Sequence, residues 1–457
     1  MIGLSFVVVL SALPGFELPD GGVVPHVDPP FQPVPTESQV APPPELPKFV
    51  VVVEPTDAGV APSPAPAAAT VLDQVFAWIR PYAVVKPTVV ASGAAVESYS
   101  QPNGSAITAA GNPVLATLPD EGRLTFQVAQ SRAGLWLNEK GSLRARLEFD
   151  FIDFTKATPT VASLPRLRLA YAEWVPADVF TLTAGQDWDL HAPVNPHGGN
   201  MVGGRFLSGN SGFMRQQVKT LFKVSEFELA AAVGMQGVNP GAKDAAFELS
   251  AVPTFAVRGV WMPGKAGRVG VSGLATSVRF APGAATERRA TAGGVSAFGD
   301  LTLGTTNVRF EMNLGRNMSN VGLLTLGFGN AAVDVDEWGG FLSVRHGFTA
   351  MHFVYASAGL QRVLTPRNVR PSYGYASMPA DGSPPAMSSA ALTGTGPGIL
   401  HNAGANLGYE LRISKNLSFM LEGFFLQTEH VLADVDLQRT SGHRRAFGGE
   451  LAAFVSF

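Results

Sequence analysis

Charged and apolar residues alternate strictly over several short stretches, and this spacing carries the clearest chemistry in the sequence. Between residues 143 and 151 the odd positions are apolar and the even positions are charged: Arg144, Arg146, Glu148 and Asp150. Successive side chains of a β-strand point to opposite faces, so these charges share one face. Arg166 and Arg168 repeat the spacing on the next segment. We expect the four arginines to form a basic ladder on adjacent strands, beside the two carboxylates.

Further charged residues fall on the same side of other alternating segments. We expect them to face water on the inside of a barrel: Arg215, Lys219, Arg258, Arg309, Glu311, Glu410, Arg412, Glu422 and Glu450. Near the middle of a bilayer, each Arg or Lys on the lipid face would cost about 2–4 kcal/mol, which favours the inner side. Two roles stay open for these charges. They can set the ion selectivity of a pore, or they can pair across strands and stabilise the wall.

Motifs typical of enzymes occur only out of context. The sequence GFGNAA at Gly327–Ala332 lacks the strand before it and the helix after it that a dinucleotide site needs. The sequences GVSGL at 270–274 and GVSAF at 294–298 lie on predicted strands with no helix behind them, unlike the serine of a nucleophile elbow. We therefore predict no catalytic residues and no enzyme activity.

Metal-binding patterns are equally weak. His191 and His197 share one loop, but the sequence has no HExxH motif and no cysteine, so a zinc site is not expected. The acidic run Asp334, Asp336 and Glu337 could bind calcium at a loop tip, although a solvated acidic loop is the simpler interpretation. We predict no metal and no cofactor.

Composition narrows the class of protein. The 457-residue chain is 46% hydrophobic but only 15% charged, against about 25% charged in average soluble proteins. Beyond the N-terminus, no apolar run reaches the roughly 18 residues that a spanning helix needs. In lipid, only helices and closed barrels satisfy their backbone polar groups, so a barrel is the remaining membrane architecture. The net charge of −3 does not indicate a basic surface of the kind that binds nucleic acid, so nucleic-acid binding is not expected.

The N-terminal region has a different composition from the rest. Residues 2–13 (IGLSFVVVLSAL) resemble the apolar core of a secretory signal, and we assign residues 1–20 to a signal peptide. Residues 21–79 are proline-rich and predict an extended periplasmic arm or linker. Within it, Phe49–Val53 could form a short strand or a segment that anchors a partner. Val71–Ile79 has apolar residues at helical spacing, which predicts one or two turns of helix just before the barrel.

From residue 80 onward the alternation recurs and predicts an all-β fold, a sixteen-stranded antiparallel transmembrane barrel over 80–457. The expected strands are 81–92, 122–137, 142–154, 166–175, 178–188, 213–224, 226–236, 246–261, 268–280, 290–303, 306–315, 336–346, 349–362, 400–413, 416–428 and 443–457. The segments 226–234 and 269–280 alternate weakly because they are rich in Ala and Gly. Tight turns alternate with long connections, as in bacterial outer-membrane barrels.

Two connections and the last residue have expected roles. The connection 189–212 is rich in Gly, and we expect it to fold inward as a constriction loop, with Asp189, His191, Asn195, His197 and Arg205. The longest connection, 364–398, is expected to lie over the mouth. The final strand alternates up to Phe457, which resembles the signal read by the machinery that inserts outer-membrane barrels.

One passage resembles a known family. The residues RLAYAEW at 168–174, followed by LTAGQDW at 182–188, resemble the tyrosine-x-glutamate and glycine-glutamine-x-tryptophan passage of DcaP-like sixteen-stranded porins. The resemblance covers about residues 120–225. It implies an outer-membrane porin of a Gram-negative bacterium, a homotrimer, and passive transport of small, often anionic, solutes. The proline-rich arm departs from the coiled-coil extension of that family, so the resemblance does not extend to trimer formation through the arm.

We therefore expect a porin in the outer membrane, with its N-terminal extension in the periplasm. Its expected partners are outer-membrane lipid, the barrel-assembly machinery, a homotrimer and small solutes, but not nucleic acid. Three alternatives stay open: a closed structural barrel that tethers the envelope through the proline-rich arm, an outer-membrane enzyme, and a secreted soluble sandwich. A barrel of sixteen strands is wide enough for an aqueous channel, which favours the porin.

Overall fold

The computed structural model describes the strands and the connections that pack on them. The described residues are 78–93, 122–151, 165–201, 204–205, 208–212, 214–235, 252–280, 288–318, 334–368, 372–373, 399–433 and 439–457. The expected signal segment, the proline-rich arm and Phe49–Val53 lie outside them. Of the predicted helix Val71–Ile79 only the last two residues are described, and Ile79 already begins the first strand.

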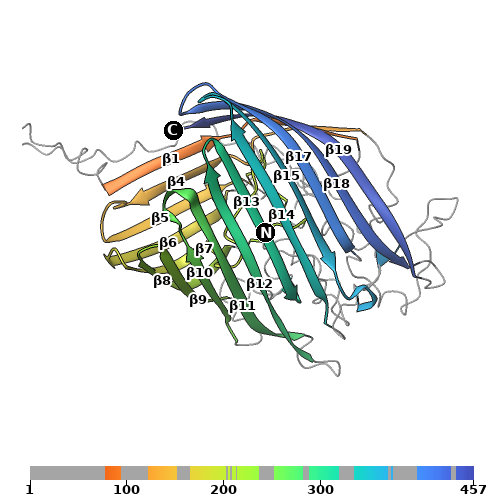
Figure 1. Ribbon diagram of the computed structural model, residues 1–457, viewed down its shortest axis with the longest axis horizontal. Helices are drawn as coiled ribbons and strands as arrows, with labels where there is room; N and C mark the ends of the chain where they lie inside the picture. Colours follow the sequence, from red (N-terminus) through yellow and green to blue (C-terminus); the bar gives the residue numbers. More distant parts are fainter. Residues whose placement is uncertain are drawn as a thin grey trace, which may run out of the picture. The chain divides into compact units, whose positions relative to one another are not determined.

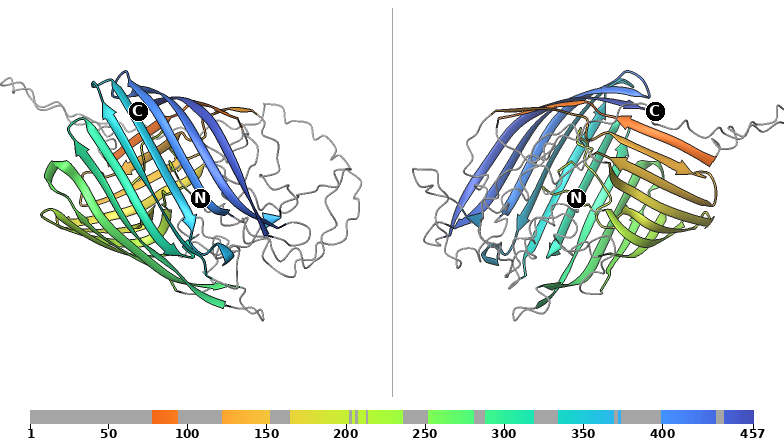
Figure 2. Two further views of the ribbon diagram at one scale, coloured as in Figure 1. Left: turned by 45° about the vertical axis from the view of Figure 1, so that its right-hand side comes forward. Right: turned by 180° about the vertical axis from the view of Figure 1, so that it is seen from behind.

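Sixteen antiparallel strands close into a barrel, as the alternation predicts (Figures 1 and 2). The first two are each broken into halves: β1 (Ile79–Val85) with β2 (Thr88–Ser92), and β3 (Arg123–Gln127) with β4 (Arg132–Leu137). The next seven are β5 (Leu143–Asp150), β6 (Arg166–Ala177), β7 (Phe180–Trp188), β8 (Met214–Val224), β9 (Phe227–Gly234), β10 (Thr254–Trp261) and β11 (Gly267–Phe280).

The last seven strands of the wall include the longest. They are β12 (Arg288–Leu303), β13 (Thr306–Arg316), β14 (Asp336–Gly347), β15 (His352–Val363), β17 (Ile399–Arg412), β18 (Leu417–Ala433) and β19 (Arg439–Ser456). Three short elements lie outside the ring of strands: the two-residue strand β16 (Ser372–Tyr373), which pairs with β18, and the 3-10 turns Gly264–Ala266 and Pro366–Asn368. Among the described residues, no helix is long and apolar enough to cross a membrane.

The barrel closes where the first strand meets the last. The first half of this strand, β1, pairs with β19 at Val84–Ser456. The second half, β2, pairs with the same strand at Thr88–Ala452. Lys86 and Pro87 interrupt the first strand, because proline has no N–H to donate to the ladder. The Pro87 carbonyl still accepts a hydrogen bond from the Ala453 N–H at 3.1 Å, so β19 bridges both halves.

Tight turns join the strands in pairs at one end of the barrel. They include Ser225–Glu226 between β8 and β9, and Gly304–Thr305 between β12 and β13. Gly304 has a φ of 62°, which glycine adopts without strain, and Ser225 has a φ of 53°. The chain enters β1 and leaves β19 at this same end (Figure 1). The strand ends that the long connections join all lie at the other end, as the sequence predicts.

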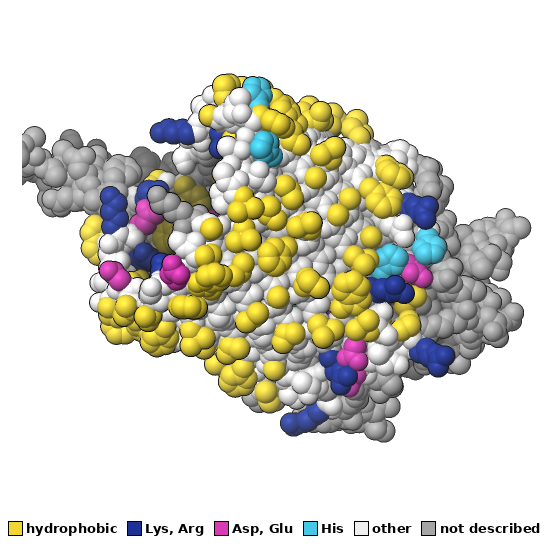
Figure 3. Space-filling view, viewed as in Figure 1, with side chains coloured by type: hydrophobic (Ala, Val, Ile, Leu, Met, Phe, Trp, Pro, Cys, Tyr) yellow, Lys and Arg dark blue, Asp and Glu magenta, His cyan; other side chains and the backbone are white. Residues whose placement is uncertain are grey.

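The outer wall is apolar over most of its height. Large hydrophobic side chains stand exposed on every second residue, such as Leu229 at 61%, Val271 at 62% and Leu421 at 60%. A space-filling view shows them as a broad band, with charged side chains confined to its edges (Figure 3). Exposed apolar surface of this extent suits lipid and would not be stable in water.

Candidate functional site

A cluster of arginines and carboxylates occupies the inner wall of β4, β5 and β6. Glu148 is its centre: it accepts hydrogen bonds from the Tyr82 hydroxyl at 2.7 Å and from Arg146 at 2.8 Å, and it also pairs with Arg168. Arg166 forms a bidentate pair with Asp150, with two hydrogen bonds of 2.8 and 2.5 Å. The sequence places these residues together because they share one face of neighbouring strands.

Aromatic rings hold Arg146 in this cluster. Its guanidinium lies 5.2 Å from the ring centre of Tyr82 and 5.0 Å from that of Trp136, and its Nε donates to the Tyr82 hydroxyl at 2.8 Å. A side chain at Gly134 would come within 2.6 Å of the Tyr82 ring, so glycine lets that ring lie flat across β4. Cation–π contacts of this kind keep a charged group oriented without removing its charge.

The cluster has more positive than negative charge. Four arginines, Arg132, Arg146, Arg166 and Arg168, face two carboxylates, Glu148 and Asp150, which leaves a net charge of +2. Arg144, which the sequence also predicts in the ladder, lies outside this cluster. It is nearer the end of the barrel with the tight turns, and it pairs with Glu173 at 2.7 Å. The structure therefore brings three of the four ladder arginines together, and it adds Arg132, which the sequence did not single out.

The described residues of the connection 189–212 lie inside the barrel; we call this connection the inner loop. It leaves the wall at Asp189, which Arg215 of β8 holds with a hydrogen bond of 2.8 Å. Leu190 then packs on Ala230, Ala232 and Leu274, and Val194 packs on Phe298 and Phe341. These inward-facing apolar residues seat the loop, so the inner wall is not uniformly polar.

The loop continues across the inner wall toward the far strands. The Asn195 carbonyl accepts from Arg309 of β13 at 3.2 Å, and the His197 N–H donates to Ser343 of β14 at 2.8 Å. The Gly199 N–H then donates to Glu422 of β18 at 3.1 Å. At its far point the Met201 N–H donates to Gln130 at 2.8 Å, and Arg132 binds the Met201 carbonyl. The loop thus reaches from β7 to the break between β3 and β4.

The returning half of the inner loop has its own seat. Ser211 donates to Glu311 through its N–H at 3.3 Å and its hydroxyl at 3.1 Å, and Asn313 donates to the Gly209 carbonyl at 3.2 Å. Gly359 and Gly404 are cross-strand partners on β15 and β17. A Cβ on Gly359 would overlap the Ser208 carbonyl, and one on Gly404 would overlap the Arg205 guanidinium. Paired glycines therefore provide the depth that the loop needs.

Burial changes the titration of the loop histidines. Desolvation lowers the pKa of His191 to about 4, and neither ring nitrogen has a hydrogen-bond partner among the described residues. Desolvation, followed by the charge of Arg309, lowers the pKa of His197 to about 4. The Asn307 amide nitrogen donates to Asp300, so the Asn307 amide oxygen faces His197 Nε2 at 2.8 Å. An amide oxygen only accepts, and His197 Nε2 therefore carries the hydrogen of the imidazole. Burial also lowers the pKa of Arg205 to about 10.

The other predicted charges also lie on the inner side of the wall, most of them in ion pairs. Lys219 pairs with Asp187, and three further pairs are Arg258–Glu228 at 2.8 Å, Arg309–Asp300 at 3.3 Å and Arg412–Glu410 at 2.9 Å. Glu450 pairs with Lys86 at 2.5 Å, and both side chains are fully buried. Glu311 and Glu422 lie beneath the inner loop and hold it in place, so they do not face open solution.

The last residue, Phe457, lies beside the first strand. The Phe457 N–H donates a hydrogen bond to the Ala83 carbonyl of β1 at 2.9 Å.

The enzyme-like and metal-like motifs take structural positions. GVSGL lies on β11 and GVSAF on β12, while Gly327–Ala332 lies outside the described residues. Asp336 accepts from Arg316 at 2.6 Å and Glu337 from Gln361 at 2.9 Å, which occupies the acidic run. No three His, Asp or Glu side chains lie close enough to share a metal ion in the described part of the chain.

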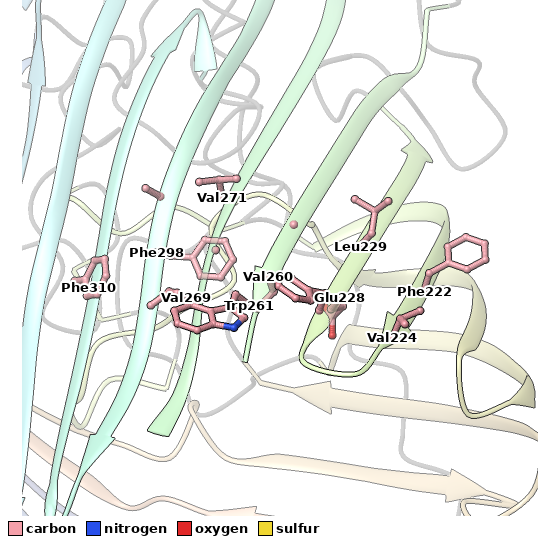
Figure 4. Close-up of a pocket in the computed structure, with 14 residues that line it drawn as sticks. Phe222, Val224, Glu228, Leu229, Val260, Trp261, Val269, Val271, Phe298 and Phe310 are labelled. Carbon is pink, nitrogen blue, oxygen red and sulfur yellow. The ribbon is translucent and has the colours of Figure 1, made fainter. Parts of the chain in front are cut away.

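An apolar groove of about 770 Å³ lies on the wall at the level of β8–β13, apart from the arginine cluster (Figure 4). Outward-facing residues such as Phe222, Leu229, Trp261 and Val271 form most of its lining. Its floor includes Gly259, where a Cβ would meet nothing within 4 Å. We assign no role to this groove in solute passage, because its outer lining belongs to the apolar face.

Residues that the sequence analysis missed mostly contact the inner loop. They are Tyr82, Gln130, Arg132, Asn307, Ser343 and Gly359. Except for Gln130, which lies in the break between β3 and β4, their inward positions follow from the alternation that identifies the other inner residues. Their contacts do not, because each partner is far away in the sequence.

Comparison with known proteins identifies the architecture. No protein-family model matches the sequence, and no curated protein matches it. Among solved structures, the outer-membrane channel DcaP of Acinetobacter baumannii is similar at 11% identity, over 83% of this chain and 97% of that one, with a TM-score of 0.57. OprB of Pseudomonas putida, in a high-pH structure, is similar at 11% identity, over 85% and 96% of the two chains, with a TM-score of 0.50. The chain therefore has the fold of the sixteen-stranded outer-membrane porins.

Proposed function

We propose that the protein is an outer-membrane porin through which small hydrophilic solutes and ions diffuse passively. The observation that carries this proposal is the inner loop: it crosses the inside of a sixteen-stranded barrel, and its far point, Met201, lies beside a cluster with a net charge of +2. Barrels of this size leave an aqueous channel, and a loop across it narrows that channel. The similarity to DcaP and OprB supports the fold on which the proposal rests.

The narrowest region of this channel favours anions in our proposal. In the ion pairs of the arginine cluster, the arginines are the more exposed partners: Arg146 is 27% exposed and Glu148 3%, and Arg166 is 23% exposed and Asp150 1%. A solute that enters the lumen meets guanidinium groups first, with the carboxylates behind them. Rings of Arg and Lys select anions in pores.

Other parts of the chain have proposed roles in the same setting. Residues 1–20 would direct export, residues 21–79 would lie in the periplasm, and Phe457 would present the last strand to the barrel-assembly machinery. The structure leads the chain into β1 at the end with the tight turns, which is the periplasmic end of such barrels. Assembly as a homotrimer is part of the proposal and can be checked by the mass of the detergent-solubilised protein.

A planar-bilayer recording in a salt gradient tests the channel. Detergent-purified, refolded protein should give steady open steps, with a reversal potential of the sign that anion preference requires. Silence from protein shown to be folded by its heat-modifiable gel migration would contradict the proposal. That result would favour the second candidate, a closed structural barrel that tethers the envelope through residues 21–79.

A further inference from the structure

A row of polar side chains crosses the outer face of the barrel at the end with the long connections. Arg362 of β15 pairs in register with His401 of β17, His401 with Glu429 of β18, and Glu429 with His443 of β19. Since neighbouring strands are about 4.8 Å apart, the row is about 14 Å long. We call these four residues, with Arg445 two positions along β19, the outer polar row.

The row faces away from the lumen. His401 lies on the same face of β17 as Leu407, which is 63% exposed, and His443 lies on the same face of β19 as Phe447, which is 66% exposed. Basic and histidine side chains gather along this edge of the apolar face, with acidic groups among them (Figure 3). The row therefore cannot take part in the proposed channel.

Its position along the barrel matches the boundary of a membrane. An outward-facing Arg costs about 2–4 kcal/mol at the bilayer midplane but only about 0–1 kcal/mol near the interface. Arg362 pairs in register with Trp338, and tryptophan is enriched at membrane interfaces. An outward-facing arginine, Arg362, beside an interfacial tryptophan, Trp338, therefore places the row at the level of lipid headgroups, in the leaflet on the side of the long connections.

The charges of the row are not balanced by one another or by other described residues. The carboxylate of the row, Glu429, already accepts a hydrogen bond from His401 Nδ1 at 2.8 Å. Arg362 is exposed and has no ion-pair partner among the described residues, and Arg445 donates only to the Gln427 amide oxygen at 3.2 Å. Two guanidinium groups are thus available to an anion, on a surface otherwise surrounded by apolar side chains.

We infer that the outer polar row binds the phosphate group of a membrane lipid in the leaflet on the side of the long connections. Guanidinium groups bind phosphate oxygens through paired hydrogen bonds, and the apolar wall below the row would contact the acyl chains. A lipid satisfies both requirements at once, whereas a free phosphate ion satisfies only the first. The inference rests on the membrane location in the proposed function, but not on conductance.

Native mass spectrometry of the full chain in detergent tests the inference. The probes are dimyristoyl phosphatidic acid, dimyristoyl phosphatidylcholine of the same chain length, and inorganic phosphate. The test variant is Arg362→Gln with Arg445→Gln. The control is Arg80→Gln with Lys140→Gln, which removes the same charge at the opposite end of the barrel, where both side chains are exposed.

Wild type and control should bind phosphatidic acid more tightly than phosphatidylcholine. The test variant should lose roughly tenfold or more, since each hydrogen bond to a charged group contributes about that factor. Equal binding by both variants would overturn the inference, and so would equal binding of inorganic phosphate and phosphatidic acid. Conductance is recorded separately, and the test variant should conduct as wild type does. A silent wild type would remove the proposed channel without affecting the phosphatidic acid result.

Discussion

At the scale of single residues, the lumen is organised by arginines that stay charged while they are held in place. Arg146 lies between two aromatic rings, and Arg166 is gripped by Asp150. Fixed side chains keep their charge at a defined point of the proposed channel, whereas freely moving ones would spread it. The excess of two positive charges in this cluster is the physical basis for the expected anion preference.

Replacing Arg146 and Arg168 with Glu should shift ion preference towards cations, because the cluster would change from a net charge of +2 to −2. The measurement is the reversal potential in a salt gradient. The control replaces the same two residues with Gln, which brings the cluster to zero and should leave a weak preference. If the Glu variant folds and keeps the wild-type potential, the two arginines do not line the conducting path.

The loop histidines predict a dependence on pH. Both have a pKa lowered to about 4 in the folded protein, against about 6.5 in a free chain, so the displaced loop binds protons more readily than the seated loop. The seating of the inner loop is therefore fully stable above pH 6.5 and weakens as the pH falls from 6.5 to 4. Conductance noise should therefore increase as the pH falls from 7 to 5.

The double variant His191→Leu with His197→Gln checks the origin of this effect. Neither replacement side chain titrates, so the increase in noise between pH 7 and pH 5 should disappear while the channel still conducts. An unchanged increase in noise would assign the pH effect to other groups, such as Glu311 and Glu422 beneath the loop.

At the scale of elements, the inner loop explains why some strands alternate weakly. The inner residues Ala230, Ala232 and Leu274 are apolar because Leu190 covers them. A strand whose two faces are both apolar loses the polar half of the pattern, although its backbone pairs normally. The weak segments 226–234 and 269–280 therefore mark where the loop rests.

The pair of inner glycines makes the seat of the loop testable. Gly359→Leu would overlap the Ser208 carbonyl and should destabilise the seated loop by about 1–3 kcal/mol, the usual cost of overpacking. Single-channel conductance should rise as the loop is displaced. Gly259→Leu is the matched control, because a Cβ added at Gly259 meets nothing within 4 Å. A conductance equal to wild type in Gly359→Leu would show that the return of the loop does not limit the channel.

At the scale of the whole molecule, closure depends on the seam between the first and last strands. Lys86 and Glu450 pair across this seam at 2.5 Å, and both are fully buried. Gln130 accepts from Lys86 at 2.8 Å and also from Met201 of the inner loop, so one site joins the seam to the loop. A buried pair of this kind is costly to break on one side only.

Lys86→Met should lower the free energy of unfolding by about 3–5 kcal/mol, because it leaves the Glu450 carboxylate buried without its cation. The measurement is the urea midpoint of the refolded protein in detergent micelles, read by tryptophan fluorescence. The double variant Lys86→Met with Glu450→Gln should recover most of the loss, since no unpaired charge remains. Equal midpoints for wild type and Lys86→Met would mean that the pair does not stabilise the seam.

The sequence by itself determined the strands and their two faces. The sixteen expected segments correspond to the strands of the wall, and the predicted ladder arginines lie on its inner side, because a period of two places every second residue on one face. The largest boundary differences occur where connections were long, as at β10, which begins at Thr254 instead of residue 246. Turn residues such as Gly304 also follow from local chemistry alone.

Only the tertiary structure decided which residues meet inside the barrel. Arg132 joins the arginine cluster, Met201 contacts Gln130, and Gly359 seats Ser208, although each pair of partners comes from separate strands or loops. Such contacts depend on the register of strands and on the closure of the ring, both of which involve residues far apart in the chain. Alternation fixes the face that a side chain occupies, but its height and its neighbours are fixed only once the wall has closed.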